Sequence, residues 1–410
     1  MLDVKINVIG MGYIGLPTAL MFAANNIEVI GTDYDEKLIT QLMLGKVTFE
    51  EDGLTELFEK AVSHGISFST TYHPADIYIV AVPTPYNKTS KKIDPTYVLS
   101  ALKSIMEISP KGSTIVIEST VSPGTINKLV YPLIKENGFI IGEDVHLVHA
   151  PERIIPGNMI YELINNSRTI GSDNIDVGNI VKELYQVFCK GEIVLTDIRT
   201  AEMTKVIENT FRDINIAFAN ELTKICRSDD MDVYEIIRIA NMHPRVNILQ
   251  PGPGVGGHCI SVDPWFLVGD YPDLTNLILA ARKINDSMPQ HVLKRIRDIM
   301  KNNNIKDISR VGLYGLTYKE NVDDIRESPT LQLLEKMDEH LAFGVKVFDP
   351  MLKEVVVENQ IMDFNDFLNE IDILVIMVSH SHIKDNMDNL KTKLILDTKN
   401  VCYFEGVYKL

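Results

Sequence analysis

The chain has 410 residues, of which 45% are hydrophobic and 23% charged, a balance that excludes disordered, collagen-like and coiled-coil proteins and suggests two or three domains. It carries 40 Lys and Arg against 56 Asp and Glu, which gives a net charge of −16. A protein that binds nucleic acid or anionic membranes needs a net charge of the opposite sign. An anionic small ligand therefore requires that basic residues be concentrated at its site.

The cysteines and the N-terminal residues predict the compartment. Four cysteines without a C-x-x-C pair predict neither a disulfide framework nor a metal site. The start, M-L-D-V-K-I-N-V-I-G, has an acidic residue where a signal peptide carries basic ones, and no apolar run reaches the ~20 residues of a membrane span. We therefore expect a cytoplasmic protein in a reducing compartment.

In the first third of the chain, short apolar runs alternate with helix-like segments, which is typical of a parallel sheet built from βαβ units. A helix is predicted over residues 16–25. The apolar runs that predict strands are 4–9, 28–32, 77–82, 114–117 and 145–148.

Near residue 198 the pattern becomes helical. Helical periodicity covers residues 200–227, continues toward 241 and returns over 274–302, after a loop at 250–257 that is rich in Gly and Pro. Strand patterns then return at 311–314, 345–348, 373–378 and 394–397. We predict an α/β protein with two Rossmann-like doubly wound domains, residues 1–197 and 303–410, joined by a helical middle domain, residues 198–302, with a long central helix.

A glycine motif, G-M-G-Y-I-G, directly follows the first predicted strand. Gly10 permits a tight turn, Gly12 lets the backbone approach a pyrophosphate, and Gly15 lets the next helix pack on the strand. Asp33 ends the second strand, where an acid can hold a ribose 2′-hydroxyl, and the two acids that soon follow would repel a 2′-phosphate. The motif therefore predicts NAD rather than NADP.

A second glycine-rich motif, G-P-G-V-G-G-H-C-I-S-V-D-P, contains Cys259. Glycines let a backbone approach a ligand closely, and Asp263 followed by Pro264 predicts a helix start with Asp as the N-cap. A thiol near such a helix start can act as a nucleophile, whereas an isolated cysteine is usually a small buried hydrophobe. We predict that Cys259 is the nucleophile and that the other three cysteines are structural.

The predicted helix over 200–227 has one polar and one apolar side. Lys205, Asn209 and Arg212 fall within about 60° of one another at 100° per residue. This polar side is either a solvated surface or a Lys–Asn pair that stabilises an oxyanion or relays a proton. The opposite side carries the apolar residues Met203, Ile207, Phe211, Ile214 and Phe218.

Several polar motifs follow predicted strands, at sheet ends where cofactors lie in doubly wound folds. They are A-V-P-T-P (81–85), E-S-T (118–120) and A-P-E-R (150–153). After a later strand, Lys319 and Arg326 are suited to a diphosphate. His243 borders the glycine-rich loop and can contact a ligand, whereas His380 and His382 have no third ligand nearby and predict a polar loop, with no metal.

Together and in this order, these motifs resemble the UDP-sugar 6-dehydrogenase family, also called the UDP-glucose/GDP-mannose dehydrogenases, over nearly the whole chain. The resemblance implies an N-terminal NAD domain, a helical dimer-forming middle and a C-terminal UDP-binding domain, and hence a homodimer or a dimer of dimers. It implies oxidation of a sugar CH2OH to a carboxylate with two NAD+ per turnover, through a thiohemiacetal and a thioester on Cys259. The product would be a uronate for surface polysaccharide synthesis.

Family members that act on UDP-glucose typically have F-G-G-x-C-F-P-K-D where this chain has V-G-G-H-C-I-S-V-D. The sequence around Cys259 and the run A-P-E-R-I-I-P-G look like those of enzymes that act on UDP-N-acetyl-D-mannosamine. Enzymes that act on UDP-N-acetylglucosamine tend to have Asn at the position where this chain has Ile155. The first of these sugars is favoured, with UDP-N-acetylglucosamine and UDP-glucose as alternatives. A two-electron hydroxy-acid dehydrogenase and a non-catalytic nucleotide-sugar sensor are more distant alternatives.

The resemblance also implies roles for site residues. Lys205 and Asn209 would stabilise an alkoxide or oxyanion, Asp263 and Thr120 would position water or shuttle protons, and Glu152 would be the base for hydrolysis. The implied NAD contacts are Gly10, Gly12, Tyr13, Ile14, Gly15, Asp33, Thr84, Thr120 and Arg326. The implied substrate contacts are Arg153, Ile154, Lys205, Asn209, Arg212, His243, Arg245, Gly256, Tyr318 and Lys319.

Overall fold

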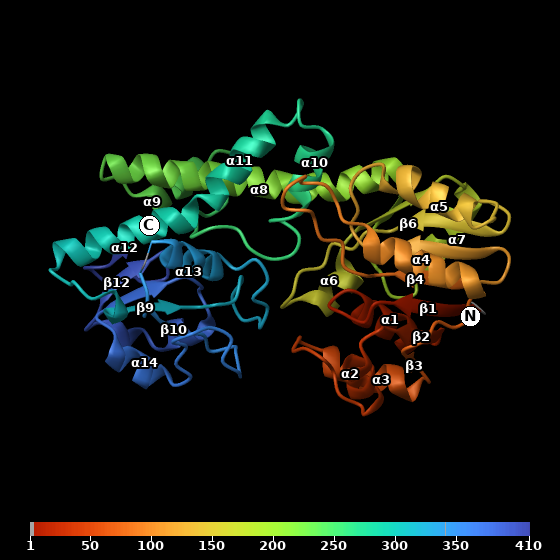
Figure 1. Cartoon of the computed structure of the whole chain (residues 1–410), viewed down its shortest axis with the longest axis horizontal. Helices are drawn as coiled ribbons and strands as arrows, with labels where there is room; N and C mark the ends of the chain where they lie inside the picture. The colour runs from red at the N-terminus through yellow and green to blue at the C-terminus, as the bar shows by residue number, and fades with distance from the viewer. Residues whose placement is uncertain (1–3, 341) are drawn as a thin grey trace. The chain divides into compact units, whose positions relative to one another are not determined.

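The computed structural model describes residues 4–340 and 342–410 (Figure 1). The chain divides into two units, Met1–Glu208 and Asn209–Leu410, and the long helix α8 (Ile198–Ser228) begins in the first and ends in the second. Each unit has its own sheet and its own apolar core. Within the described residues, no helix combines the length and the apolarity that a membrane span needs.

Unit 1 is built on an eight-stranded sheet with the order β3-β2-β1-β4-β5-β6-β7-β8. All neighbouring strands are parallel except β6 and β7, which are antiparallel. The strand order reverses between β1 and β4, the kind of switch point at which ligands bind in open α/β sheets. The strands are β1 (Lys5–Ile9), β2 (Glu28–Thr32), β3 (Ser67–Ser69), β4 (Ile77–Val80), β5 (Ser113–Ile117), β6 (Val145–His149), β7 (Arg168–Ser172) and β8 (Ile193–Thr196).

Helices cover both faces of this sheet, because strand side chains alternate between two apolar clusters. In β4, Ile77 and Ile79 belong to one cluster, while Tyr78 and Val80 belong to the other. The first cluster packs under α1, α3, α6 and α7, and the second under α4 and α5. The helices of this unit before α8 are α1 (Gly15–Ala24), α2 (Glu36–Met43), α3 (Leu54–Ser63), α4 (Thr96–Ile108), η1 (Ile126–Val130), α5 (Tyr131–Glu136), α6 (Met159–Asn165) and α7 (Ile175–Tyr185).

Unit 2 contains a five-stranded parallel sheet with the order β10-β9-β11-β12-β13. Its strands are β9 (Val311–Tyr314), β10 (Lys346–Phe348), β11 (Ile373–Ile376), β12 (Leu394–Asp397) and β13 (Tyr408–Lys409). Its helices are α9 (Val233–Ala240), α10 (Asp263–Asp270), α11 (Asn276–Asp286), α12 (Met288–Asn302), η2 (Ile308–Arg310), α13 (Pro329–Glu339), α14 (Phe364–Glu370), α15 (Ser381–Asp385) and η3 (Met387–Leu390).

The prediction of two doubly wound α/β domains and a long central helix is confirmed. The helical stretch predicted over 274–302 was wrong in one respect: it is two helices, which meet at Ser287, because Pro289 in the first turn of α12 lacks the N–H that a continuous helix needs. Strands β3, β7, β8 and β13 were not predicted. They are short, or, like β7 with Arg168, begin with a charged residue.

Candidate active site

The turn between β1 and α1 has the geometry of a dinucleotide site. Gly10 has a φ of 94°, and a Cβ on Gly15 would lie 1.8 Å from the carbonyl oxygen of Gly10, so both positions require glycine for the fold itself. A Cβ on Gly12, in contrast, would meet no protein atom within 4 Å. The backbone at Gly12 therefore faces open space, where a phosphate can approach the start of α1.

Polar side chains at the strand ends complete this half of the site. Asp33 accepts the N–H of Met11 at 2.7 Å and stays half-buried, so its carboxylate keeps acceptor positions for a ribose hydroxyl. The hydroxyl of Thr84 donates to the carbonyl of Thr120 at 2.7 Å and ties two strand-end motifs together. The ring of Tyr13 stacks on that of Phe49, with centroids 4.4 Å apart. These residues fit NAD.

Glu152 is buried and ionically paired. Its Oε2 accepts from Arg168, and its Oε1 accepts the backbone N–H of Arg153 at 2.5 Å and of Ile154 at 3.2 Å. Arg168 also donates to Oε1 of Glu118 at 3.1 Å. Glu152 could be found from its place in the A-P-E-R motif, whereas Arg168 could not, because a charged residue at the start of a strand carries no motif.

Arg153 and Ile154, the two predicted substrate contacts next to Glu152, have side chains that contact other residues of unit 1. The Nη2 of Arg153 pairs with Glu208 at 2.7 Å and also donates to the hydroxyl of Thr169 at 2.7 Å. The side chain of Ile154 packs in the apolar core, which leaves its backbone as the part that a ligand can reach. Ile14 also packs against this core, beside the glycine turn.

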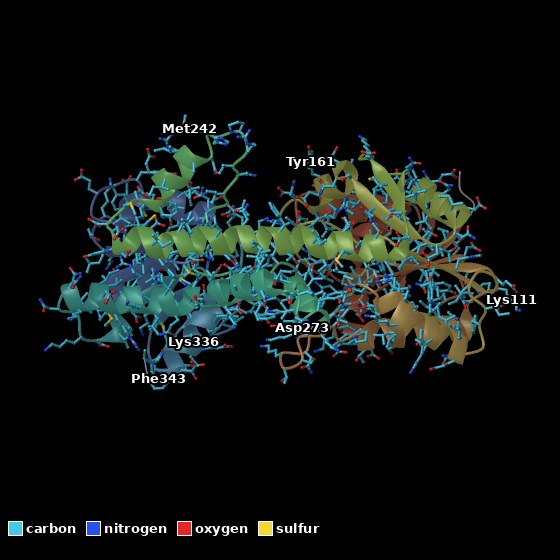
Figure 2. All side chains as sticks on the ribbon, turned by 90° about the horizontal axis from the view of Figure 1, so that it is seen from above. Lys111, Tyr161, Met242, Asp273, Lys336 and Phe343 are labelled. Atoms are coloured by element: carbon cyan, nitrogen blue, oxygen red, sulfur yellow. The ribbon has the colours of Figure 1, made fainter. Side chains whose placement is uncertain are left out.

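Helix α8 buries its polar side and exposes its apolar side; Figure 2 shows it as one uninterrupted helix. Lys205 and Asn209 are each 5% exposed, whereas Phe211 is 64% exposed. The interpretation of this polar side as a solvated surface is therefore wrong for Lys205 and Asn209, although Arg212 is exposed. The Nδ2 of Asn209 donates to Oδ2 of Asp263 at 2.6 Å, which links α8 to the first residue of α10.

A second group of buried polar residues, which the sequence analysis missed, extends this link along α8. Asp213 accepts from Nη1 of Arg282 at 2.5 Å and from Nδ2 of Asn285 at 2.7 Å. Asn285 in turn accepts from Asn220 at 2.9 Å, and Asn220 accepts the N–H of Gly252 at 2.9 Å. Burial raises the pKa of Asp213 despite these partners. The hydrogen bonds fix the start of the glycine-rich loop to α8.

Cys259 is exposed at the end of that loop, four residues before α10. Its carbonyl accepts the N–H of Val262 at 3.1 Å and of Asp263 at 2.9 Å. The prediction that Asp263 is the N-cap was wrong: Val262 occupies that position, and Asp263 is the first helical residue, with its carboxylate bonded to Asn209. The other cysteines are buried, as predicted: Cys189, Cys226 and Cys402.

The glycines of this loop pack against the protein itself. A Cβ on Gly256 would lie 2.6 Å from the carbonyl oxygen of Glu327 and 2.8 Å from Cβ of Tyr318. The N–H of Gly257 donates to the carbonyl of Arg326 at 3.0 Å. The segment that follows β9 therefore supports the loop that carries Cys259, a contact that the motif spacing did not predict.

The remaining predicted ligands of unit 2 lie near the surface or in ion pairs. Arg326 donates from Nε and Nη2 to Asp324, at 2.9 and 2.7 Å, and Lys319 is half-buried. His243 and Arg245 are exposed on the segment after α9. The contacts of these side chains with NAD or substrate stay predictions.

The polar loop predicted at His380 and His382 was wrong, because His380 is the N-cap residue of α15 and His382 lies within that helix. His380 is buried, with its Nε2 3.4 Å from Oδ2 of Asp349 and its Nδ1 accepting the N–H of Asn321 at 2.9 Å. His382 instead stacks beside Tyr314, with centroids 6.0 Å apart. Over residues 4–340 and 342–410, no group of three ligating side chains that could hold a metal ion is found.

Comparison with known proteins gives consecutive matches to three family models. Residues 4–189 match the NAD binding domain of the UDP-glucose/GDP-mannose dehydrogenase family, residues 199–287 its central domain and residues 312–403 its UDP binding domain. The UDP-N-acetyl-D-mannosamine dehydrogenase of Methanococcus vannielii is 43% identical over 97% of this chain and 93% of its own length. An NDP-N-acetyl-D-galactosaminuronic acid dehydrogenase of Ralstonia solanacearum is 38% identical, over 97% and 96%.

A solved structure supports the same relationship. The UDP-N-acetyl-mannosamine dehydrogenase of Staphylococcus aureus superimposes with a TM-score of 0.88 at 43% identity and covers 99% of this chain and 98% of its own. The likeness therefore spans the fold as well as the sequence.

The glycine turn permits a test that separates cofactor binding from folding. Because the space beside Gly12 is open, Gly12→Ala should leave the free energy of unfolding within about 0.5 kcal/mol of the wild type and raise the Kd for NADH at least about tenfold. Gly15→Ala, the matched control, should destabilise the fold because its Cβ meets the Gly10 carbonyl. Fluorescence titration and thermal unfolding measure both; unchanged NADH binding by Gly12→Ala would contradict this assignment.

Proposed function

Because the chain belongs to the UDP-glucose/GDP-mannose dehydrogenase family, we propose that it oxidises the C6 hydroxyl of a UDP-N-acetylhexosamine to a carboxylate, with UDP-N-acetyl-D-mannosamine as the preferred substrate. The observation that carries this proposal is the full-length likeness to enzymes of that sugar. The exposed thiol of Cys259 in front of α10 supports it chemically.

The proposed reaction removes four electrons from C6 in two oxidation steps. The Gly10–Gly15 turn would hold NAD, which would supply hydride acceptance for both steps. In the first step, the C6 hydroxyl gives up its proton to a bound water or a base as the aldehyde forms. Lys205 and Asn209 would stabilise the alkoxide that develops, since both are buried and carry N–H donors. Donors of this kind are worth ~3–4 kcal/mol each in other acyl chemistry.

The second step is proposed to pass through a covalent bond to Cys259. Its thiolate adds to the aldehyde carbon to give a thiohemiacetal, and loss of a hydride turns this into a thioester. Water then adds to the thioester carbon as one of its protons passes to Glu152, and the thiolate leaves to give a carboxylic acid. This acid loses its remaining proton to solvent to form the carboxylate product. Asp263, fixed by Asn209, and Thr120 would position the water or carry protons.

The substrate brings two phosphate charges to a protein whose net charge is −16. We propose that Arg212, Arg245 and Lys319 supply the compensating charge, together with Arg153, and that Arg326 serves the NAD pyrophosphate. The proposed division of labour is residues 1–197 for NAD, 198–302 for the middle domain and 303–410 for UDP. A reducing compartment, the cytoplasm, suits a nucleophilic thiol, and the uronate product suits surface polysaccharide synthesis.

We further propose a homodimer, or a dimer of dimers, through the apolar side of α8. Ile207, Phe211, Phe218 and Ile225 recur at helical spacing on that side, and each is at least half exposed in the single chain. Met242, at the edge of unit 2 in Figure 2, is 74% exposed. A second copy of the chain would cover this surface, because symmetric dimers join the same patch on both subunits.

The substrate and the electron count can be measured together. We expect UDP-N-acetyl-D-mannosamine to be oxidised with the highest kcat/KM among UDP-linked N-acetylmannosamine, N-acetylglucosamine, N-acetylgalactosamine and glucose. Each molecule of uronate should accompany two molecules of NADH. Absorbance at the NADH band and mass spectrometry of the product give both numbers. One NADH per product would identify a two-electron alcohol dehydrogenase instead.

The role of Cys259 has its own test. Cys259→Ala should lower uronate formation by about 10³-fold or more and leave the fold intact, because the side chain is exposed. No sugar adduct should then be found on the protein. Cys402→Ser serves as a control, because it alters a buried thiol of the same unit and should leave the reaction mechanism unchanged. Normal turnover of Cys259→Ala would remove the thiol from the mechanism.

The proposed dimer is tested by a charge on the apolar side of α8. Phe211→Glu should convert the dimer to monomers, because the carboxylate would have to be buried without a partner. Phe343→Glu is a matched control, since Phe343 is 60% exposed in the same unit but lies away from α8 (Figure 2). Sedimentation gives the mass of each variant, and a Phe211→Glu protein that stays dimeric would rule out this interface.

A further inference from the structure

Unit 1 contains a buried cluster of polar and charged side chains in which only Glu152 has a role assigned above. Glu118 follows β5, Glu152 follows β6, Arg168 begins β7 and Tyr185 ends α7. All four are at least nine-tenths buried. Such groups are costly to bury, so their arrangement calls for a functional or structural reason.

Arg168 joins the two carboxylates. Its Nη1 donates to Oε1 of Glu118 at 3.1 Å, and its Nη2 donates to Oε2 of Glu152. The hydroxyl of Tyr185 also donates to Oε1 of Glu118, at 3.0 Å. The guanidinium lies over the ring of Tyr185, 4.1 Å from its centroid, so it is held from two directions.

The charges of the cluster do not cancel when both acids are ionised. Two carboxylates and one guanidinium leave a net charge of −1 in a buried place, which one proton removes. Glu152 receives three N–H donors, from Arg168 and from the backbone of Arg153 and Ile154. Glu118 receives one N–H and one hydroxyl, so Glu118 is the acid that more readily keeps the proton.

The titration behaviour agrees with this geometry. Burial raises the pKa of Glu118 to about 7, against the pull of Arg168, and the charge of Glu152 acts in the same direction as burial. The thiol of Cys189 also lies within electrostatic range of Arg168. Burial lowers the pKa of His149, on β6, to about 4, so that imidazole stays neutral through the same pH range.

We propose that Glu118 is a positioning residue that controls, through the arginine they share, how Glu152 is held for the hydrolytic water. With Glu118 protonated, the guanidinium of Arg168 pairs with Glu152 alone and occupies its Oε2 firmly. With Glu118 ionised, the guanidinium is divided between two carboxylates, and Oε2 of Glu152 is freer to contact the hydrolytic water.

This inference rests on the proposed role of Glu152 as the base that accepts the proton of the hydrolytic water. A carboxylate offers about four acceptor positions, of which Glu152 uses three, so one remains for that water. The consequence is that thioester hydrolysis speeds up as the pH rises through about 7, where Glu118 loses its proton.

The experiment follows the decay of the Cys259-bound thioester after a single turnover, by acid quenching and mass spectrometry from pH 5 to 9. The wild type should show an inflection near pH 7. Glu118→Gln, which mimics the protonated acid, should remove the inflection and stay on the slower plateau. Tyr185→Phe removes a donor that lowers the pKa of Glu118, so its inflection should move to higher pH.

The matched control is Glu202→Gln. Glu202 is another buried carboxyl of unit 1 whose pKa burial raises to about 7, but it accepts the backbone N–H of Gly124 and Ile126 at 2.5 and 2.9 Å. This variant should keep the inflection. A wild type without the inflection, a Glu118→Gln protein that keeps it, or its loss in Glu202→Gln alone would overturn the inference.

One further variant separates the two proposals. If Glu152→Gln hydrolyses the thioester as fast as the wild type, the proposed role of Glu152 fails and the inference fails with it. If Glu152→Gln is slow while Glu118→Gln keeps the wild-type inflection, only the inference about Glu118 fails. A structural role for Glu118 would lower stability without moving the pH at which the rate changes, so both readouts are recorded.

Discussion

The arrangement of unit 2 depends on which side of α8 is buried. A helix usually covers its apolar side, but α8 exposes Phe211 and Phe218 and buries Asn209, Asp213 and Asn220. Buried polar groups must find hydrogen-bond partners, and the partners found here are the residues that position α10 and the glycine-rich loop. The position of the thiol therefore follows from the polar side of α8.

The loop that carries Cys259 is held by two stretches of chain that are far apart in sequence. Helix α8 holds Asp263 and Gly252, one at each end of the loop. The segment after β9 packs Tyr318 against Gly256, which leaves no space for any side chain at that position. A loop fixed at both ends and along its length presents the thiol in one place, the preorganisation that covalent catalysis requires.

The strands and the glycine turn of the fold could be predicted from the sequence, because they depend on local patterns of residues. Apolar runs predict the strands at 28–32 and 394–397 with their observed bounds, and the turn at Gly10 follows from spacing alone. The side of α8 that is covered could not be predicted. A helical wheel groups Lys205 with Asn209, but the partners that accompany burial lie on other helices. Asp263 of α10 bonds Asn209, and Arg282 and Asn285 of α11 bond Asp213.

The same reason explains the other differences. The N-cap expected at Asp263 is taken by Val262, because the carboxylate of Asp263 is bonded to a distant Asn, and no local rule contains that bond. Arg168 is the first residue of β7, a strand that the apolar pattern did not predict. Its partners Glu118 and Glu152 follow two other strands, so no local pattern links the three residues. Long-range polar contacts, unlike strand and turn patterns, leave little trace in one sequence.

The most direct measurement of the account is a double-mutant cycle on Asn209 and Asp263, scored by the rate at which Cys259 captures the substrate. The hydrogen bond between them makes the two side chains a single unit, so the account predicts that Asn209→Ala and Asp263→Ala together lose little more than the worse single variant. The coupling free energy should then exceed about 1.5 kcal/mol. If the losses in activation free energy of the two single variants add to within about 0.5 kcal/mol, α8 does not position α10 and the Cys259 loop before it.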